Sequence, residues 1–459
     1  MTFSRLSRLD TRESVWINVS NKGSQDFRNL LMWREEAPMA GSRVLFVSGS
    51  LGLGHATRDL AIARELRRKA PGIEIGWLAA SPTAETLDGA GETLVPECRD
   101  YRCETDTADA MGVKGRLNLT GYVYRALGKW VHNAGVISRA CERGAFDLLI
   151  GDETYEIIVT NVLGIRPFPS IPFVMMYDFW GMDASTRKLF ERLGAWGLNF
   201  IWSRERRVTG RGENAALFIG EPADIQARRF GAFLPNRRRS VGGHVIFLGY
   251  ILTFDPASLP PKPALKADLG YGLSPLVVCT VGGTAVGREL LELCGRAYPL
   301  AAARVPGLRL VLVSGPRIDP AVIEAPVGVE RRGMVPDLYR HLAASDLVVT
   351  QGGGTTTLEL TALRVPFLFF PVKSQVEQEV TIAGRLARHG AGVRMDLSGM
   401  TPEILAAQIV RHIGTPVSYP RVPFDGASRA ADVILDRIER RRRLCGQRAK
   451  RNPPALDRP

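Results

Sequence analysis

From residue 43 onward, short apolar runs alternate with longer stretches in which apolar positions recur every three or four residues. The run RVLFVS at 43–48 is followed by a stretch of helical periodicity at 58–70 and by a second apolar run at 73–79. This order predicts a strand, a helix and another strand. Short strands that are apolar throughout and alternate with helices indicate a parallel sheet with both faces covered.

The strand–helix pattern occurs twice, on either side of a proline-rich segment at 253–266 that is typical of a linker. Further strands are expected at 148–150, 173–176 and 245–248, and after the linker at 276–281, 308–314, 346–350 and 366–371. The predicted fold class is therefore α/β, with two tandem Rossmann-like, doubly wound parallel-sheet domains that face a cleft.

The pattern also divides the whole chain. The expected parts are an N-terminal extension at 1–38, a first Rossmann-like domain at 39–250, a linker at 251–265, a second Rossmann-like domain at 266–420, a C-terminal helix at 421–445 and a basic tail at 446–459. The extension is polar and weakly patterned, so we expect it to be poorly ordered or to reflect an upstream start codon. The last helix is expected to pack back on the first domain.

Composition adds limits on location and partners. No apolar run approaches the roughly 18 residues that span a bilayer, and the first residues lack a signal-peptide core, so a cytoplasmic protein is expected. The net charge of +13 favours anionic partners. Nucleic acid is not expected among them, because no nucleic-acid-binding signature occurs, whereas peripheral contact with an anionic membrane surface stays open. The six cysteines lack zinc-ligand spacing and are interpreted as reduced structural thiols.

The first motif with chemical potential is GSLGLGHATR at 49–58, between a strand and a helix. Glycines there let the backbone approach a ligand closely. The glycine spacing is not that of a dinucleotide site, and no acidic residue ends the second strand, which argues against an NAD-dependent dehydrogenase. His55 is the candidate catalytic residue, although a lone histidine is often structural. Gly52, Gly54 and Arg58 are predicted to bind the acceptor, that is, the substrate that receives a transferred group.

The second motif is TQGGGTTTLE at 350–359. Its glycines follow a strand and open a helix, so backbone amides and hydroxyls converge at a positive helix end and form a cradle for a diphosphate. Glu359 can accept both hydroxyls of a ribose, and Glu377 and Gln378, after the next strand, suit sugar hydroxyls. The alternative interpretation is that Glu359, Glu377 and Gln378 bind no sugar and are polar residues that stabilise the start of a helix. The predicted donor-binding residues are Gln351, Gly352, Gly353, Gly354, Thr355, Glu359, Glu377 and Gln378, with Gly283 and Thr284 from the opposite loop.

Acidic residues follow two strands of the first domain. Asp152 and Glu153 come after the run at 148–150, and Asp178 occupies a corresponding place after 173–176. We predict that Asp152 acts with His55 in catalysis and that Asp178 contributes to the acceptor site. The chain has no Asp-x-Asp pair, so neither a metal nor another cofactor is expected.

Together these motifs resemble the GT-B superfamily of glycosyltransferases. The likeness covers about 44–60 and 276–395, and it is most specific at 346–380. Within this superfamily, the chain most resembles family 28, which includes the lipid-linked peptidoglycan N-acetylglucosaminyltransferase and plant galactolipid synthases. The resemblance implies that His55 is the general base, that Glu359 binds ribose, that Gly352 to Thr355 and Gly283 to Thr284 flank the diphosphate, and that Gln378, with Glu377 beside it, contacts the donor hexose. Many relatives carry histidine where this chain has Gln351, whose amide adds no charge.

The resemblance implies an inverting, metal-independent hexosyltransferase that uses a nucleotide-sugar, with UDP-sugars as the family expectation. Its hydroxyl acceptor is open and is either lipid-linked or a small natural product. Two alternatives share the fold. One is a nucleotide-sugar 2-epimerase, for which the carboxylates Asp152 and Glu153 would supply acid and base. The other is a non-catalytic nucleotide-sugar-binding subunit.

Overall fold

The computed structural model describes residues 41–49, 53–103, 112–113, 116–117, 119–166, 170–184, 188–282, 287–373 and 377–451. The extension at 1–38 and the predicted site residues Gly52, Gly283 and Thr284 lie outside this part of the chain.

The first domain is built on a parallel sheet with the strand order β3-β2-β1-β6-β7-β8-β9. The central strands consist of buried residues because helices cover both faces of the sheet. The strands are β1 (Arg43–Val47), β2 (Glu74–Leu78), β3 (Thr93–Leu94), β6 (Leu148–Asp152), β7 (Phe173–Tyr177), β8 (Ala215–Ile219) and β9 (Val245–Gly249). The order reverses between β1 and β6, and ligands of such sheets bind at the carboxyl ends beside this point.

The second domain repeats this architecture with the order β12-β11-β10-β13-β14-β15, again parallel throughout its described strands. Its strands are β10 (Leu276–Thr280), β11 (Arg309–Val313), β12 (Val329–Arg332), β13 (Leu347–Gln351), β14 (Phe367–Phe370) and β15 (Val393–Arg394). The reversal falls between β10 and β13. The fold class expected from the sequence, two Rossmann-like parallel-sheet domains, is confirmed.

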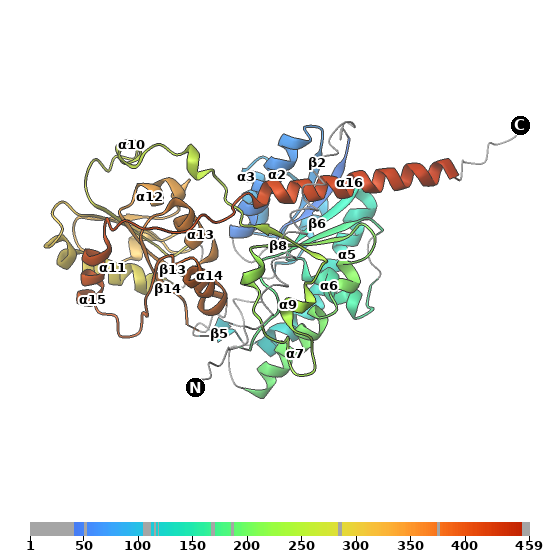
Figure 1. The fold of residues 1–459 in the computed structure, drawn as a ribbon, viewed down its shortest axis with the longest axis horizontal. Helices are drawn as coiled ribbons and strands as arrows, with labels where there is room; N and C mark the ends of the chain where they lie inside the picture. Colours follow the sequence, from blue (N-terminus) through green and yellow to red (C-terminus); the bar gives the residue numbers. More distant parts are fainter. Residues whose placement is uncertain are drawn as a thin grey trace, which may run out of the picture. The chain divides into compact units, whose positions relative to one another are not determined.

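Helices connect the strands in both domains (Figure 1). In the first domain they are α2 (Leu53–Lys69), α3 (Thr83–Gly89), η1 (Pro96–Arg99), α5 (Leu119–Gly144), α6 (Tyr155–Val162), α7 (Leu189–Trp202), α8 (Arg206–Thr209), η2 (Pro222–Asp224) and α9 (Arg237–Ser240), with the small antiparallel pair β4 (Gly112–Val113) and β5 (Arg116–Leu117). Then follow η3 (Pro256–Ser258), α10 (Lys262–Asp268), α11 (Arg288–Ala302), η4 (Pro320–Val322), α12 (Leu338–Ala344), α13 (Gly354–Leu363), the π-helical turn η5 (Glu377–Ile382), α14 (Ala383–Arg388), α15 (Pro402–His412) and α16 (Gly426–Arg451). Within the described residues, no helix has both the length and the apolar character needed to cross a bilayer.

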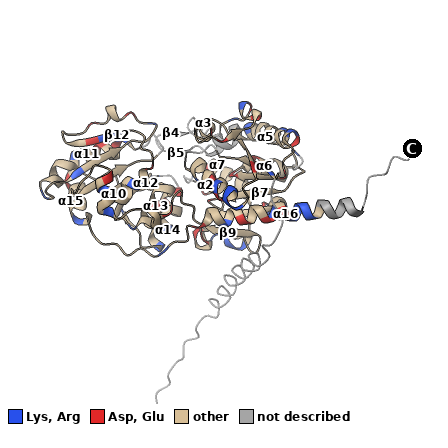
Figure 2. Ribbon diagram, turned by 90° about the horizontal axis from the view of Figure 1, so that it is seen from above, with Lys and Arg blue, Asp and Glu red and all other residues tan. Residues whose placement is uncertain are grey.

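The final helix, α16, packs along α2 of the first domain (Figure 1). Lys69 at the end of α2 lies 2.7 Å from the carboxylate of Asp432, and its ammonium group also donates to the carbonyl of Ser428 at 2.7 Å. Arg441 donates to the carbonyl of Asp147 at 3.0 Å. Basic side chains recur along the described part of this helix (Figure 2). The chain therefore crosses to the second domain at β9 and returns to the first domain at its end.

Hydrogen bonds from α14 of the second domain reach the loop after β8 of the first. Arg388 donates to Asp224 at 2.8 Å and Arg385 donates to the same carboxylate at 3.1 Å. His389 lies 3.1 Å from Glu221. Burial would raise the pKa of Asp224, but the two guanidinium groups and a backbone amide hold it below its ordinary value.

Two expectations about local structure need correction. Helix α2 begins at Leu53 rather than near Arg58, so His55 lies inside the first helical turn and not at a loop tip. The periodicity missed the start because glycines and His55 interrupt the apolar pattern there. The strands β3, β8, β12 and β15 were not foreseen. Helix α10 begins at Lys262, inside the segment expected to be a linker.

Candidate active site

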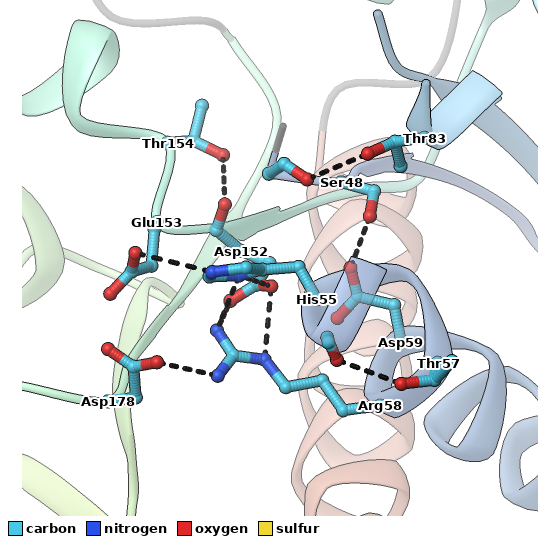
Figure 3. A network of polar contacts seen from close by, with 12 residues as sticks. Ser48, His55, Thr57, Arg58, Asp59, Thr83, Asp152, Glu153, Thr154 and Asp178 are labelled. Atoms are coloured by element: carbon cyan, nitrogen blue, oxygen red, sulfur yellow. Dashed lines mark hydrogen bonds and ion pairs between the residues drawn. The ribbon is translucent and has the colours of Figure 1, made fainter. Parts of the chain in front are cut away.

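His55 and Asp152 form the centre of the candidate site (Figure 3). Because β1 and β6 are neighbours in the sheet, the helix that follows β1 brings His55 beside Asp152, the last residue of β6. The Nδ1 atom of His55 lies 2.7 Å from Oδ2 of Asp152, which is completely buried. A Cβ atom on Gly49 would lie only 3.2 Å from Nδ1 of His55, so glycine is needed there for close approach.

Arg58 holds two carboxylates at once. Its Nη2 and Nε atoms donate to the two oxygens of Asp152 at 2.5 and 3.1 Å, and Nη1 donates to Asp178 at 2.7 Å. Nη2 also lies 2.8 Å from Nδ1 of His55. The carboxylate of Asp152 can only accept a hydrogen bond, so its 2.7 Å contact assigns the histidine proton to Nδ1, and the guanidinium group, itself only a donor, is then a close neighbour of Nδ1 and not its hydrogen-bond partner. Nε2 of His55 then carries the lone pair.

The acidic groups around His55 do not share one charge state. Burial would raise the pKa of Asp152, but Arg58 and His55 hold it below its ordinary value. Burial, and then the charge of Asp178, raise the pKa of Glu153 well above its usual range. Burial opposes ionisation of Asp178 too, but Arg58 and a hydrogen bond from Glu153 lower its pKa. Burial and the charge of Asp178 thus disfavour ionisation of Glu153, whereas Arg58 favours the carboxylate forms of Asp152 and Asp178.

One ligand atom from each of His55, Glu153 and Asp178 falls within 4.8 Å of the others, which is the spacing of a candidate cation site. Nε2 of His55 lies 3.8 Å from Oε2 of Glu153. The guanidinium group of Arg58 already supplies a positive charge beside Asp178, and burial raises the pKa of Glu153. The positive charge of Arg58 thus offsets part of the negative charge of this acidic cluster.

On the donor side, Gln351 ends β13 and is buried, and Gly354 begins α13. A Cβ atom on Gly352 would lie 3.2 Å from Pro371 and 3.3 Å from Oε1 of Gln378, so close packing requires glycine at this position. A Cβ atom on Gly353 would meet nothing within 4 Å. Among the described residues, the amino end of α13 therefore has room beside Gly353, which is what an anion cradle requires.

Three further predicted donor residues lie beyond this cradle. The side-chain oxygen of Gln378 accepts a hydrogen bond of 3.0 Å from the backbone of Val372. Glu377 is exposed at the start of the π-helical turn η5. Glu359 is half-buried in the second turn of α13, and the loss of solvent raises its pKa to about 7.

The two predicted half-sites meet at Gly54 and Thr355. A Cβ atom on Gly54, one residue before His55, would lie 3.0 Å from the Oγ1 atom of Thr355 in α13. The structure thus brings the first glycine-rich segment against the start of the donor helix.

An apolar pocket opens in the first domain beside the acidic cluster. Tyr155 links the two, because its hydroxyl donates to Oε1 of Glu153 at 3.0 Å. Tyr177 and Phe179, on either side of Asp178, also line the pocket. The complete lining is Trp130, Tyr155, Ile158, Val159, Tyr177, Phe179, Met182, Leu198, Ile201 and Trp202. Tyr177, Phe179 and Met182 come from the end of β7 and the segment after it, and the other lining residues come from α5, α6 and α7.

Sequence reasoning also missed Ser48 and Asp59. Asp59 follows His55 by four positions on α2, so both lie on one helix face. That spacing was the available signal, but a helix predicted to start at Arg58 concealed it.

Comparison with known proteins identifies the class. Residues 277–418 match the model of the glycosyltransferase family 28 C-terminal domain. A protein of Methanosarcina mazei, described as an uncharacterized glycosyltransferase, is 34% identical over 392 residues, which are 82% of this chain and 92% of that protein. The chain therefore belongs to the glycosyltransferases, and its second domain matches the family 28 type.

Two more comparisons cover most of the chain. The UDP-N-acetylglucosamine--N-acetylmuramyl-(pentapeptide) pyrophosphoryl-undecaprenol N-acetylglucosamine transferase of Clavibacter michiganensis is 27% identical over 415 residues, covering 87% of this chain and 97% of that one. The solved structure of spinosyn rhamnosyltransferase SpnG, complexed with thymidine diphosphate, has a TM-score of 0.53 at 20% identity and covers 87% of this chain and 96% of that chain. This structural likeness shows that the chain and the rhamnosyltransferase share the GT-B fold.

Proposed function

We propose that the protein transfers a hexose or N-acetylhexosamine from a nucleotide-sugar, most simply a UDP-sugar, to an acceptor hydroxyl with inversion at the anomeric carbon. The observation that carries this proposal is the His55–Asp152 pair, 2.7 Å apart, beside a donor cradle that touches the preceding residue, Gly54. A single displacement needs a base that takes the proton of the attacking hydroxyl and, close to it, an anion-binding helix end that stabilises the leaving diphosphate.

In the proposed reaction the acceptor oxygen attacks the anomeric carbon from the side opposite the diphosphate. Nε2 of His55 takes the hydroxyl proton as the new carbon–oxygen bond forms and the bond to the phosphate oxygen breaks. Asp152 stabilises the imidazolium through Nδ1, and the nucleoside diphosphate leaves with the bonding electrons. General-base help of this kind contributes roughly 10²–10⁴ in rate. Amide groups at the start of α13 and the hydroxyl of Thr355 stabilise the leaving diphosphate.

The donor assignment rests on the α13 region. A uridine donor is supported by the Clavibacter relative, whose name specifies UDP-N-acetylglucosamine. The carboxylate of Glu359 would accept both ribose hydroxyls. Gln378 would present its amide nitrogen to a hexose hydroxyl, because its oxygen is engaged by Val372. Gln351, buried at the end of β13, can donate to a phosphate without adding a charge.

For the acceptor, we infer a molecule with an apolar part that enters the pocket between Tyr155 and Trp202, and with a hydroxyl directed to His55. The pocket lining is almost wholly apolar, and Tyr155 connects it to Glu153. Lipid-linked acceptors and small natural products both fit this chemistry, and the Clavibacter relative's name specifies an undecaprenol-linked one. A protein with such an acceptor would work in the cytoplasm at the membrane surface, where the basic residues of α16 favour anionic lipids.

Calorimetric binding tests the donor site first. UDP, TDP, GDP and NAD would be titrated into wild type and Glu359→Ala. Selective UDP or TDP binding that weakens at least tenfold in the variant, about 1.4 kcal/mol, supports the proposal. NAD binding, or no nucleotide binding by the folded protein, contradicts it. An acceptor screen with the UDP-sugar then follows, with His55→Ala as the inactive control and the anomeric configuration read by NMR.

A further inference from the structure

Met182 lines the apolar pocket from the segment after β7, and a buried asparagine of α7 holds its backbone. Oδ1 of Asn199 accepts a hydrogen bond of 2.8 Å from the backbone amide of Met182. Nδ2 of Asn199 donates to the carbonyl oxygens of Met182 and Phe230, each at 2.7 Å. Asn199 is only 2% exposed, and both its N–H groups and its oxygen are therefore used within the protein.

A second buried side chain, Arg237 of α9, holds the same stretch. Its Nη2 atom donates to the carbonyl of Met182 and to Oδ1 of Asp183, both at 2.7 Å, and its Nη1 atom donates to Oδ2 of Asp183 at 3.1 Å. Gly181 has a φ of +83°, and a Cβ atom there would lie 2.7 Å from Nε of Arg237. Glycine at this position thus makes the turn and admits the guanidinium group. The carbonyl of Met182 accepts from both Asn199 and Arg237, so the segment is fixed at this point.

These hydrogen bonds join two parts of the pocket lining. The segment after β7 supplies Phe179 and Met182. The residues that flank Asn199 on α7 supply another part, namely Leu198, Ile201 and Trp202. Hydrogen bonds are directional, whereas apolar contacts are not, so the amide fixes the distance between the two parts more strictly than packing alone does.

We propose that Asn199 is a positioning residue for the acceptor. It fixes the separation between α7 and the segment 178–183, and with it the width of the pocket that receives the acceptor's apolar part. This inference rests on the proposed function of the pocket. Within the described residues, the hydrogen bonds of Asn199 run to backbone groups around the pocket and not to the His55–Asp152 pair. Loosening them should therefore weaken the hold on the acceptor and leave the nucleotide site as it is.

Binding of 1-octanol, an alcohol with an apolar chain, tests the positioning without turnover. Trp130 and Trp202 line the pocket, so tryptophan fluorescence reports its occupancy. We expect Asn199→Ala to weaken octanol binding at least ~10-fold, with UDP affinity within about twofold of wild type. Equal octanol affinity in wild type and Asn199→Ala, or no octanol binding to wild type, overturns the proposal.

The matched control is Asn214→Ala. Asn214 also joins two backbone groups of the first domain, since it accepts from the amide of Phe173 at 2.9 Å and donates to the carbonyl of Val208 at 2.8 Å. It lies near the amino end of β7 and does not line the pocket. Octanol affinity should stay within about twofold of wild type in this variant. A similar loss in both variants would indicate general loosening of the domain, which contradicts the proposal.

Asp183→Asn is the second variant, for use where Asn199→Ala does not fold. The side chain of Asp183 is 19% exposed and pairs with Arg237, so removing its charge loosens the same stretch from a less buried position. Octanol binding should weaken at least ~3-fold, because a hydrogen bond between charged groups is lost. Unchanged octanol affinity would overturn the proposal. The UDP titration with Glu359→Ala does not involve the pocket, so it separates failure of the proposed function from failure of this inference.

Discussion

The carboxylate of Asp152 lies 2.7 Å from Nδ1 of His55, although 97 positions separate the two residues in the chain. Arg58, one turn further along the helix that carries His55, donates to both oxygens of the same carboxylate. His55, Asp152 and Arg58 therefore form one unit at the carboxyl ends of β1 and β6.

Asp152→Asn should abolish most of the transfer activity while preserving the donor site. An Asn amide can donate to Nδ1 of His55, which moves the histidine proton to Nε2 and leaves no lone pair for the acceptor. We expect the initial transfer rate to fall roughly 10²–10⁴-fold, with UDP affinity unchanged within about twofold. The thermal unfolding temperature serves as the control for folding. A variant with more than a tenth of wild-type activity would rule out this role for Asp152.

Glu359 should make the unfolding free energy depend on pH. Its pKa is about 7 in the folded protein against an ordinary value of 4.5, so between these values the folded state retains a proton that the unfolded state has lost. The stabilisation that this proton gives is present at low pH and disappears as pH rises through about 7. Relative to wild type, Glu359→Gln should therefore gain stability between pH 5 and pH 8 in denaturant titrations, at roughly constant ionic strength. A difference independent of pH would contradict the raised pKa.

Filling the apolar pocket should exclude the acceptor without disturbing the donor. Val159 lines the pocket and is buried, so Val159→Phe places a ring in its space. We expect acceptor KM to rise at least ~10-fold, a loss of about 1.4 kcal/mol, with UDP affinity unchanged. Val159→Ala is the matched control, since it enlarges the pocket at the same position. Equal acceptor KM for both variants would place the acceptor elsewhere.

The contact between Gly54 and Thr355 should appear as coupling between the two half-sites. Alanine at a helical position usually stabilises by about 0.5–1 kcal/mol relative to glycine. At Gly54, however, the added Cβ would lie 3.0 Å from Oγ1 of Thr355 and push α13 away. Gly54→Ala should thus lower kcat/KM, and Thr355→Ala should relieve part of the loss. A double-mutant cycle with coupling below about 0.5 kcal/mol would contradict this contact in the working enzyme.

Chelation should leave the activity intact. Arg58 provides a positive charge between Asp152 and Asp178, and burial raises the pKa of Glu153, so the acidic cluster is already neutralised in part. Transfer rates with EDTA and with added Mn²⁺ should agree within about twofold. Loss of activity in EDTA with recovery in Mn²⁺ would instead make His55, Glu153 and Asp178 a working metal site.

The sequence by itself determined the strand–helix alternation, the two Rossmann-like domains and the glycine-rich segments at 49–54 and 352–354, because periodicity and glycine placement are local properties. It also singled out His55, Asp152 and Glu359 as chemically suited residues. It could not fix the start of α2, since glycines obscure helical periodicity there, and it did not detect the short edge strand β3.

Only the tertiary structure decided which of these groups meet and in what charge state. Asp152 became the partner of His55 because β1 and β6 pair in the sheet. Arg58, foreseen as an acceptor-binding group, lies instead in ion pairs with Asp152 and Asp178, so its contact with the acceptor stays a prediction. The raised pKa of Glu359 follows from burial, and that of Glu153 follows from burial and from the charge of Asp178. These depend on distances across the fold, which no local pattern of residues encodes.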